Sequence, residues 1–138
     1  MDSTHIRGTG DVGSRKRFRR VRNEEFVCQH CGTRVRPLSN GSCRNHCPQC
    51  LWSKHVDLIP GDRAAGCGGL MPCVAVRRDA RRGWLLVHRC LECGQESKNR
   101  AARGSLQSDC VEVMARVARE ASARLIKRRR RRGRSRAV

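Results

Sequence analysis

The sequence predicts a small metal-stapled α+β fold with zinc-ribbon-like knuckles and a β-hairpin, followed by a C-terminal amphipathic basic helix. Three observations predict it. Cysteines occur in Cys-x-x-Cys pairs, two short apolar segments at 73–78 and 84–89 flank a five-residue turn, and apolar residues after Ser108 recur every three or four positions. These patterns are typical of metal knuckles, hairpins and amphipathic helices, respectively.

The need for metal follows from the scarcity of apolar surface. Of the 138 residues, 31% are charged, and the chain has two Phe, two Trp and no Tyr. Domains with so small a core are usually stabilised by disulfides or by metal. The first twenty residues contain no secretory signal, and no segment is apolar enough to span a membrane, so we expect a cytoplasmic protein. In a reducing compartment, Cys-x-x-Cys pairs favour metal over disulfides.

The first metal site is predicted from two pairs with fifteen residues between them. Cys28 and Cys31 form the first pair, and Cys47 and Cys50 form the second. Each Cys-x-x-Cys unit folds into a tight turn that presents two thiolates, and two such turns complete a tetrahedron. We therefore expect all four cysteines to bind one zinc ion.

The second site is built on the pair Cys90 and Cys93, which follows the predicted hairpin. Cys67 lies between glycines that allow a tight turn, so it is the expected third ligand. His55 is the chosen fourth ligand, because it opens the segment that leads to Cys67. The alternatives are His46, Cys43 and Cys73. Cys43 and Cys73 are otherwise expected to be thiols outside the ligand sets, and the expected cofactor is two zinc ions per chain.

The hairpin and the helix complete the fold. The strands at 73–78 and 84–89 are joined by residues 79–83. The helix is expected to start at Ser108 as N-cap and to run through the terminal cations until Gly133 stops it. Its apolar stripe either packs on the metal domain, as most such stripes do, or binds a partner. The members of the stripe are Cys110, Met114, Val117, Ala121 and Leu125.

Several stretches of the central segment carry a family resemblance. They are Arg44-Asn45-His46-Cys47-Pro48, Cys28-x-x-Cys31, Ser53-Lys54-His55-Val56-Asp57, Pro60-Gly61-Asp62-Arg63, residues 84–93 and Asn99-Arg100. In these stretches the chain resembles the RNHCP family over about residues 26–104. The resemblance implies a single metal-binding domain and little about activity. We therefore divide the chain into a disordered basic arm (1–25), a metal-binding domain (26–107) and a helix with an Arg-rich tail (108–138).

The charge predicts a polyanionic partner. The formal net charge is +19, and residues 127–138 carry eight Lys and Arg with no Asp or Glu. Nucleic acid is the commonest partner for such a chain, and Arg-rich segments suit irregular RNA through phosphate forks and base stacking. The predicted RNA-binding residues are Arg77, Arg78, Arg81, Arg82, Lys127, Arg128, Arg129, Arg130, Arg131, Arg132, Arg134 and Arg136. Further cations expected on the surface of the domain are Arg44, Lys54, Arg63 and Arg89.

The expected partner is ribosomal RNA, with ribosomal proteins as further partners, because basic extensions on a small zinc domain resemble the construction of small ribosomal proteins. No membrane and no small-molecule substrate are expected. A terminal Arg run also occurs in solubility tails, nuclear-import signals and lipid anchors. A DNA-binding zinc protein is a further alternative, although the sequence has no helix-turn-helix or repeated finger pattern.

The enzymatic alternative is a metal-dependent nuclease. The order His55, Asp57 and then the pair at 90–93 resembles the layout of HNH nucleases, in which a His is the general base and a metal binds the scissile phosphate. The usual adjacent Asp-His order is reversed and spaced here. Because that order determines which groups reach a phosphate together, we expect no catalytic residues.

Overall fold

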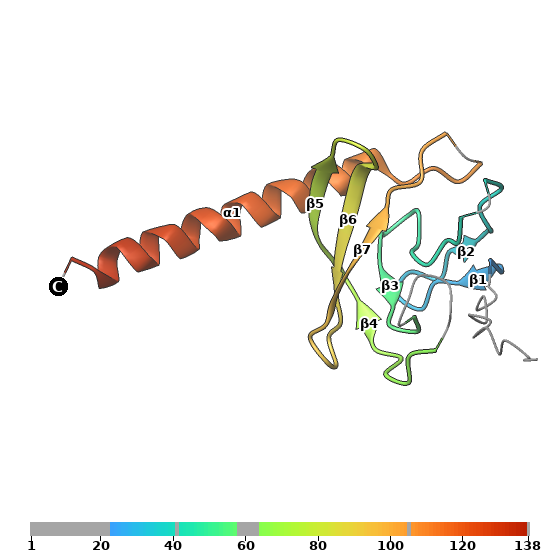
Figure 1. The fold of residues 1–138 in the computed structure, drawn as a ribbon, viewed down its shortest axis with the longest axis horizontal. Coiled ribbons are helices and arrows are strands. Elements are labelled where there is room, and N and C mark those ends of the chain that lie inside the picture. Colours follow the sequence, from blue (N-terminus) through green and yellow to red (C-terminus); the bar gives the residue numbers. More distant parts are fainter. Residues whose placement is uncertain (1–22, 41, 58–63, 105, 138) are drawn as a thin grey trace, which may run out of the picture.

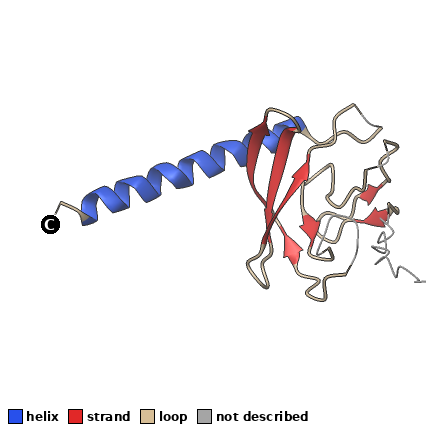
Figure 2. Ribbon diagram, viewed as in Figure 1, coloured by secondary structure: helices blue, strands red, loops and turns tan. Residues whose placement is uncertain are grey.

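The computed structural model describes residues 23–40, 42–57, 64–104 and 106–137. The predicted basic arm therefore lies almost wholly outside the described residues. Figures 1 and 2 show a small β-rich body from which one helix projects. The elements in chain order are β1 (Phe26–Val27), β2 (Arg34–Val35), β3 (Ser53–Lys54), β4 (Leu70–Met71), β5 (Cys73–Asp79), β6 (Gly83–Arg89), β7 (Glu96–Arg100) and α1 (Val111–Ser135). The α+β fold predicted from the sequence is confirmed.

The largest sheet is antiparallel, in the order β5-β6-β7. Its first two strands are the predicted hairpin. At the turn, Asp79 Oδ1 accepts hydrogen bonds from the backbone N–H groups of Arg81 at 2.9 Å and Arg82 at 2.8 Å. Gly83 follows with φ 77°, a conformation that glycine adopts without steric cost. Side-chain capping and one glycine therefore determine where the chain reverses.

Two smaller antiparallel ribbons, β1-β2 and β3-β4, lie beside this sheet. β1 pairs Phe26 with Val35, and β3 pairs Ser53 with Met71. Figure 1 shows β1-β2 on the side of the body opposite the projecting helix and β3-β4 nearer to the large sheet. Since two-residue strands have little stability of their own, these ribbons depend on what holds the intervening turns.

The buried apolar residues form two small clusters. One contains Cys28, Val35 and Cys47, so two of its three members are cysteines of the first predicted metal site. The other contains Leu51, Leu86 and Met114 and joins the sheet to the start of α1. Cores of this size leave the fold dependent on additional constraints.

The helix begins two residues later than the sequence predicts and also ends later. Cys110 is the N-cap and makes no side-chain capping hydrogen bond. Ser108 is not the cap, because the adjacent Asp109 bonds to other parts of the domain. These bonds keep Asp109 out of the helix, so Cys110 is the last extended residue. Gly133 lies inside the helix, since a single exposed glycine costs only about 1 kcal/mol.

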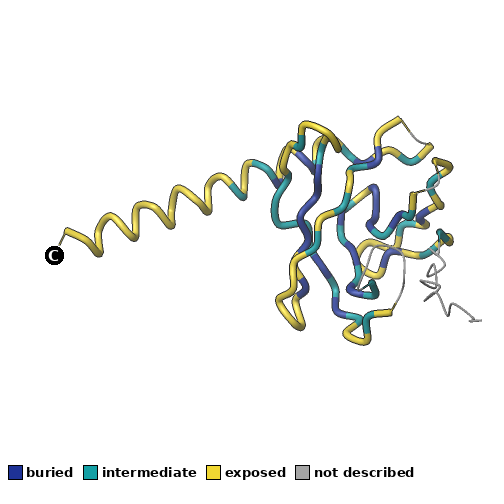
Figure 3. Tube along the Cα trace, in the orientation of Figure 1, coloured by how far each residue is buried: buried dark blue, intermediate teal, exposed yellow. Residues whose placement is uncertain are grey.

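The buried residues of α1 lie in its first turns. Met114 and Val117 are buried, whereas Leu125 is 58% exposed. Residues 122–137 are all exposed, as Figure 3 shows. The predicted stripe therefore packs on the domain at its beginning and faces solvent at its end. In the described part of the chain no helix has the combined length and hydrophobicity to span a membrane.

Leu51 has an unusual backbone conformation at the end of the second knuckle. Its φ is 63°, while glycines occupy the corresponding positions after the other two knuckles, Gly32 and Gly94. A left-handed conformation costs a non-glycine residue about 1–2 kcal/mol. The Leu51 side chain is fully buried against Leu86 and Met114, and this burial offsets the strain.

This compensation predicts that, at Leu51, Gly and Ala reverse their usual order of stability. Leu51→Ala should lower the free energy of unfolding by about 2–5 kcal/mol, because it loses the burial and keeps the strain. Leu51→Gly should be at least as stable as Leu51→Ala, because it relieves strain of about 1 kcal/mol. Denaturant unfolding in excess metal measures both variants.

The matched control is Leu86, which is fully buried in β6 with ordinary strand geometry. There Gly should be less stable than Ala by about 0.5–1 kcal/mol. The same order of Gly and Ala at both positions would contradict the strain at Leu51.

Candidate metal centres

The first knuckle follows β1 and positions Cys28 and Cys31. The backbone N–H of Gly32 donates to Cys28 O at 2.9 Å, and the N–H of Cys28 donates to Thr33 O at 2.9 Å. Gly32 has φ 77°. These bonds close a tight turn, so both thiols lie on the same side of the chain.

The second and third knuckles repeat this geometry. In the second, the N–H of Leu51 donates to Cys47 O at 2.9 Å. In the third, between β6 and β7, the N–H of Gly94 donates to Cys90 O at 3.0 Å. The same local sequence therefore gives the same presentation of two thiols in all three places.

Cys67 is held beside the third knuckle by close backbone packing. The N–H of His55 donates to Gly69 O at 2.8 Å, and the N–H of Gly68 donates to His55 O at 2.9 Å. A Cβ on Gly69 would lie 2.6 Å from Cys90 Sγ, which is too close for two atoms that are not bonded. Gly69 must therefore be glycine for this loop to approach the knuckle.

These turns bring the donor atoms of eight residues into two groups. One group contains Cys28, Cys31, Cys47 and Cys50, and the other contains His55, Cys67, Cys90 and Cys93. Within each group all four donor atoms lie within 4.8 Å of one another. These are the two ligand sets proposed from the sequence.

The spacing inside each group fits one tetrahedral ion. Two sulfurs bound to the same zinc at about 2.3 Å are about 3.8 Å apart. In the first group Cys28 Sγ is 3.6 Å from Cys50 Sγ, and Cys31 Sγ is 3.5 Å from Cys47 Sγ. In the second group Cys67 Sγ is 3.6 Å from Cys90 Sγ. Thiolate and imidazole donors in closed sets of four are typical of structural zinc sites.

The second group includes the His55 ring, whose Nδ1 is 3.3 Å from Cys93 Sγ. Among the described residues, the other candidates for the fourth ligand lie outside both groups. His46 Nε2 contacts Asp109, and Cys73 Sγ donates to Ala75 O at 3.5 Å. None of the ten cysteines, all of which are described, forms a disulfide.

The thiols within each group differ in acidity. Burial raises the pKa of Cys31, but hydrogen bonds from Thr33 and from neighbouring cysteines outweigh burial and lower the pKa to about 6. Burial raises the pKa of Cys90 as well, but hydrogen bonds from backbone N–H groups of its own turn outweigh burial and lower this pKa to about 6. Burial raises the pKa of Cys50. Because ligating thiols are deprotonated, metal binding releases protons, and affinity falls as the pH falls.

A stacked pair braces the first site from outside. The rings of His30 and Trp52 are nearly parallel, with centroids 3.8 Å apart and an interplanar angle of 5°. His30 lies in the first knuckle, and Trp52 follows the second. The stacking therefore joins the two halves of this ligand set.

The sequence model of the RNHCP domain matches residues 23–114. The chain belongs to the RNHCP domain family. No curated protein and no solved structure matches it. The match extends beyond the stretch recognised from the sequence and includes the first turn of α1. Polar contacts of the signature residues reach the segment just before this turn.

The Arg and His of the RNHCP signature bind a buried carboxylate just before α1. Arg44 Nη2 donates to Asp109 Oδ1 at 3.0 Å, and His46 Nε2 donates to Asp109 Oδ2 at 2.8 Å. The backbone N–H of Ala102 donates to the same oxygen at 2.6 Å. The side chains of Arg44 and Asp109 are 2% and 0% exposed. The expectation that Arg44 contributes to the basic surface is therefore wrong, because its charge is buried against Asp109.

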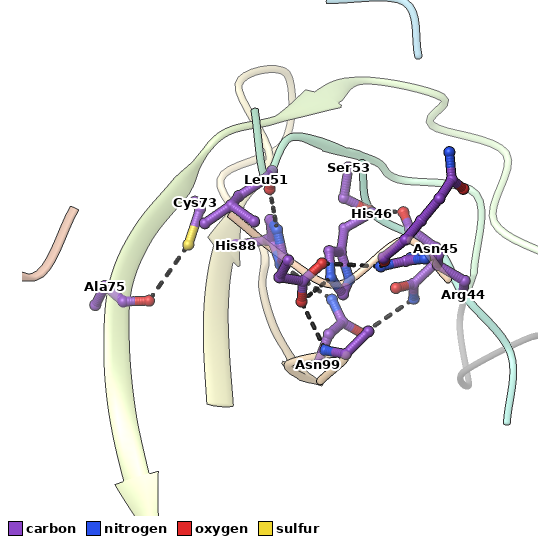
Figure 4. Close-up of polar contacts among 12 residues, drawn as sticks. Arg44, Asn45, His46, Leu51, Ser53, Cys73, Ala75, His88 and Asn99 are labelled. Carbon is purple, nitrogen blue, oxygen red and sulfur yellow. Dashed lines mark hydrogen bonds and ion pairs between the residues drawn. The ribbon is translucent and has the colours of Figure 1, made fainter. Parts of the chain in front are cut away.

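The Asn of the signature continues the network into the sheet (Figure 4). Asn45 Nδ2 donates to Asn99 Oδ1 at 3.0 Å, and Asn99 Nδ2 donates to His88 Nδ1 at 3.0 Å. His88 Nε2 then donates to the carbonyl of the strained Leu51 at 2.7 Å. Burial lowers the pKa of His88 to about 4, so its ring is neutral at neutral pH and can both donate and accept.

The RNHCP signature thus fastens the second knuckle to the sheet and to the helix. Removing one partner of a buried ion pair typically costs about 3–5 kcal/mol, because the other charge is left uncompensated. The roles of His88 and Asp109 were not predicted from the sequence. The one available signal was the position of His88 inside the apolar run of β6.

The second ligand set is tested by two cysteine substitutions. Wild-type protein is expected to contain two metal ions per chain, and Cys67→Ser should contain one, because three ligands are left at that site. Cys73→Ser is the matched control and should keep two, since this buried thiol lies outside both groups. Elemental analysis of purified protein provides the count. Two ions in Cys67→Ser would show that Cys67 is not a ligand, and one ion in Cys73→Ser would show that Cys73 is one.

Proposed function

We propose that this RNHCP protein holds two structural zinc ions and binds RNA, ribosomal RNA in the first place, in the cytoplasm. The metal part is supported by the donor sets. Each has four protein ligands, three or four of them thiols. A closed tetrahedron has no position for a substrate, so zinc serves here to fold the domain.

The observation that carries the RNA proposal is the exposed cationic end of α1. The helix extends beyond the domain, and residues 122–137 are all exposed (Figures 1 and 3). Eight cations lie between Lys127 and Arg136, and the last acidic residue before them is Glu120. The cations surround the helix and repel one another. A polyanion removes this repulsion and gains affinity from counterion release.

The hairpin adds a second set of cations to the proposed surface. Arg77, Arg78, Arg81 and Arg82 are all exposed around the β5-β6 turn. Figure 1 shows this turn on the same side of the body as the start of α1. One folded RNA could therefore contact both, as ribosomal RNA does with proteins that carry basic extensions. Ribosomal proteins are further partners in this proposal.

The proposal includes no catalysis, and the position of His55 supports this. In a nuclease of the HNH type the His must be available as a general base. Here His55 Nδ1 lies among three thiols as a metal donor. Asp57 Oδ2 accepts a hydrogen bond from Asn45 Nδ2 at 3.5 Å. Metal-dependent cleavage that disappears in Asp57→Ala would favour the nuclease instead.

Deleting residues 127–138 tests the RNA proposal through its salt dependence. The deletion removes up to eight phosphate contacts. With about 0.7 per contact for single strands, and about half of the contacts made, the slope of log affinity against log salt should become shallower by about 3. Fluorescence anisotropy with ribosomal RNA fragments over a range of salt measures the slope.

The control is a full-length variant in which residues 127–132 are replaced by Gln, which keeps the helix and removes six charges. It should lose most of the same slope. Metal content should stay at two per chain in both variants, since the tail buries almost no apolar surface. An unchanged affinity and slope would make the tail a solubility or targeting element.

A further inference from the structure

A groove of about 710 Å³ separates the sheet from the segment before the second knuckle. Its walls come from the β5-β6 hairpin, from β7 with residues 101–103, and from residues within 38–40 and 42–46. Its volume lies in the range of about 300–1,000 Å³ that is typical of sites for small organic groups. Its lining includes five cations and one tryptophan, namely Arg78, Arg82, Lys98, Arg100, Arg103 and Trp84.

The groove is strongly positive. Five of its lining residues are Lys or Arg, and the lining includes no Asp or Glu. Asp79, which is partly exposed in the β5-β6 turn, has a carboxylate oxygen 4.0 Å from Arg82 Nη2, and its pKa is lowered by backbone N–H groups and by Arg82 and Arg100. The buried Asp109 is already neutralised by Arg44. The lining therefore keeps a large excess of positive charge.

The groove also contains a partly exposed aromatic ring. Trp84 lies near the start of β6, with the guanidinium carbon of Arg78 5.5 Å from its ring centroid. The amide side chains of Asn45 and Asn99 line the groove beside it. A ring that stacks a base, with cations for the flanking phosphates, is the combination used by proteins that bind single strands.

We propose that this groove binds single-stranded RNA, with a base against Trp84 and the flanking phosphates on Lys98, Arg100 and Arg103. The inference rests on the proposed RNA-binding function and adds a site distinct from the helical tail. A duplex is too wide to enter a groove of this volume and keeps its bases stacked inside. An unpaired nucleotide can enter, because its base is free to leave the stack.

The experiment compares two triple variants of the full-length, metal-loaded protein. The groove variant is Lys98→Ala/Arg100→Ala/Arg103→Ala, and all three side chains are exposed. The matched control is Arg36→Ala/Arg116→Ala/Arg119→Ala, which removes three exposed cations that do not line the groove. The probe is a short single-stranded oligouridylate, and fluorescence anisotropy measures its affinity.

A second readout locates the probe. In a Trp52→Phe background, Trp84 is the one remaining tryptophan, so stacking of uracil on its ring quenches the protein fluorescence. Affinity should fall about tenfold in the groove variant, with a salt slope shallower by about 2 for three lost contacts, and the quenching should disappear. The control should keep the quenching and most of the affinity. Unchanged metal content verifies that each variant is folded.

Three outcomes would overturn the groove as a single-strand site. Equal losses in both variants would indicate general electrostatic attraction, and unchanged binding in the groove variant, with Trp84 not quenched in the wild type, would leave the tail as the binding element. Quenching of Trp84 by duplex RNA as effectively as by the oligouridylate would exclude selectivity for unpaired strands. Absence of any RNA binding by the wild type would overturn the proposed function as well, whereas the first three outcomes leave that function intact.

Discussion

The fold depends on eight donor atoms from separate segments of the chain, which come together in two groups of four. The buried clusters are too small to replace this constraint, and the cluster around Val35 is itself built from ligand cysteines, Cys28 and Cys47. Ribbons of two residues each, such as β1-β2, have no independent stability. A bound ion supplies free energy that apolar burial supplies in larger domains, because a ligand set of this kind does not exist in the unfolded chain.

The buried ionic network of Arg44, His46 and Asp109 also fixes the start of the helix relative to the domain. Asp109 ends the chain segment before α1 and is bound by Arg44 and His46, which lie immediately before the second knuckle. A movement of that knuckle would therefore be transmitted to the start of the helix. The exposed cations of residues 127–136 begin beyond this anchored part, so the domain determines the direction in which they project.

Local chemistry explains which features the sequence revealed. The Cys-x-x-Cys turns and the hairpin are determined by neighbouring residues, so their spacing predicted them. Cys67 was proposed from its flanking glycines and His55 from its position before Cys67, and the structure brings both together with Cys90 and Cys93. Arg44 and Asp109 were different, because they are 65 positions apart and burial of an arginine depends on a partner that spacing alone does not identify. The start of α1 was misplaced for the same reason, since Asp109 serves this long-range contact. The strain at Leu51 was equally invisible, because a glycine is the residue expected at that position of a knuckle.

Amide hydrogen exchange before and after metal removal tests the central dependence most directly. The protein is stripped with a chelator under reducing conditions, and protection is followed in β6, whose residues 85–88 are all buried. The account predicts that protection in β6 and at the first turn of α1 is lost together and returns on addition of zinc, because both are held through the metal-bound knuckles. Full protection of β6 in protein shown to be metal-free would contradict it, since the core and the buried ion pair would then hold the fold by themselves.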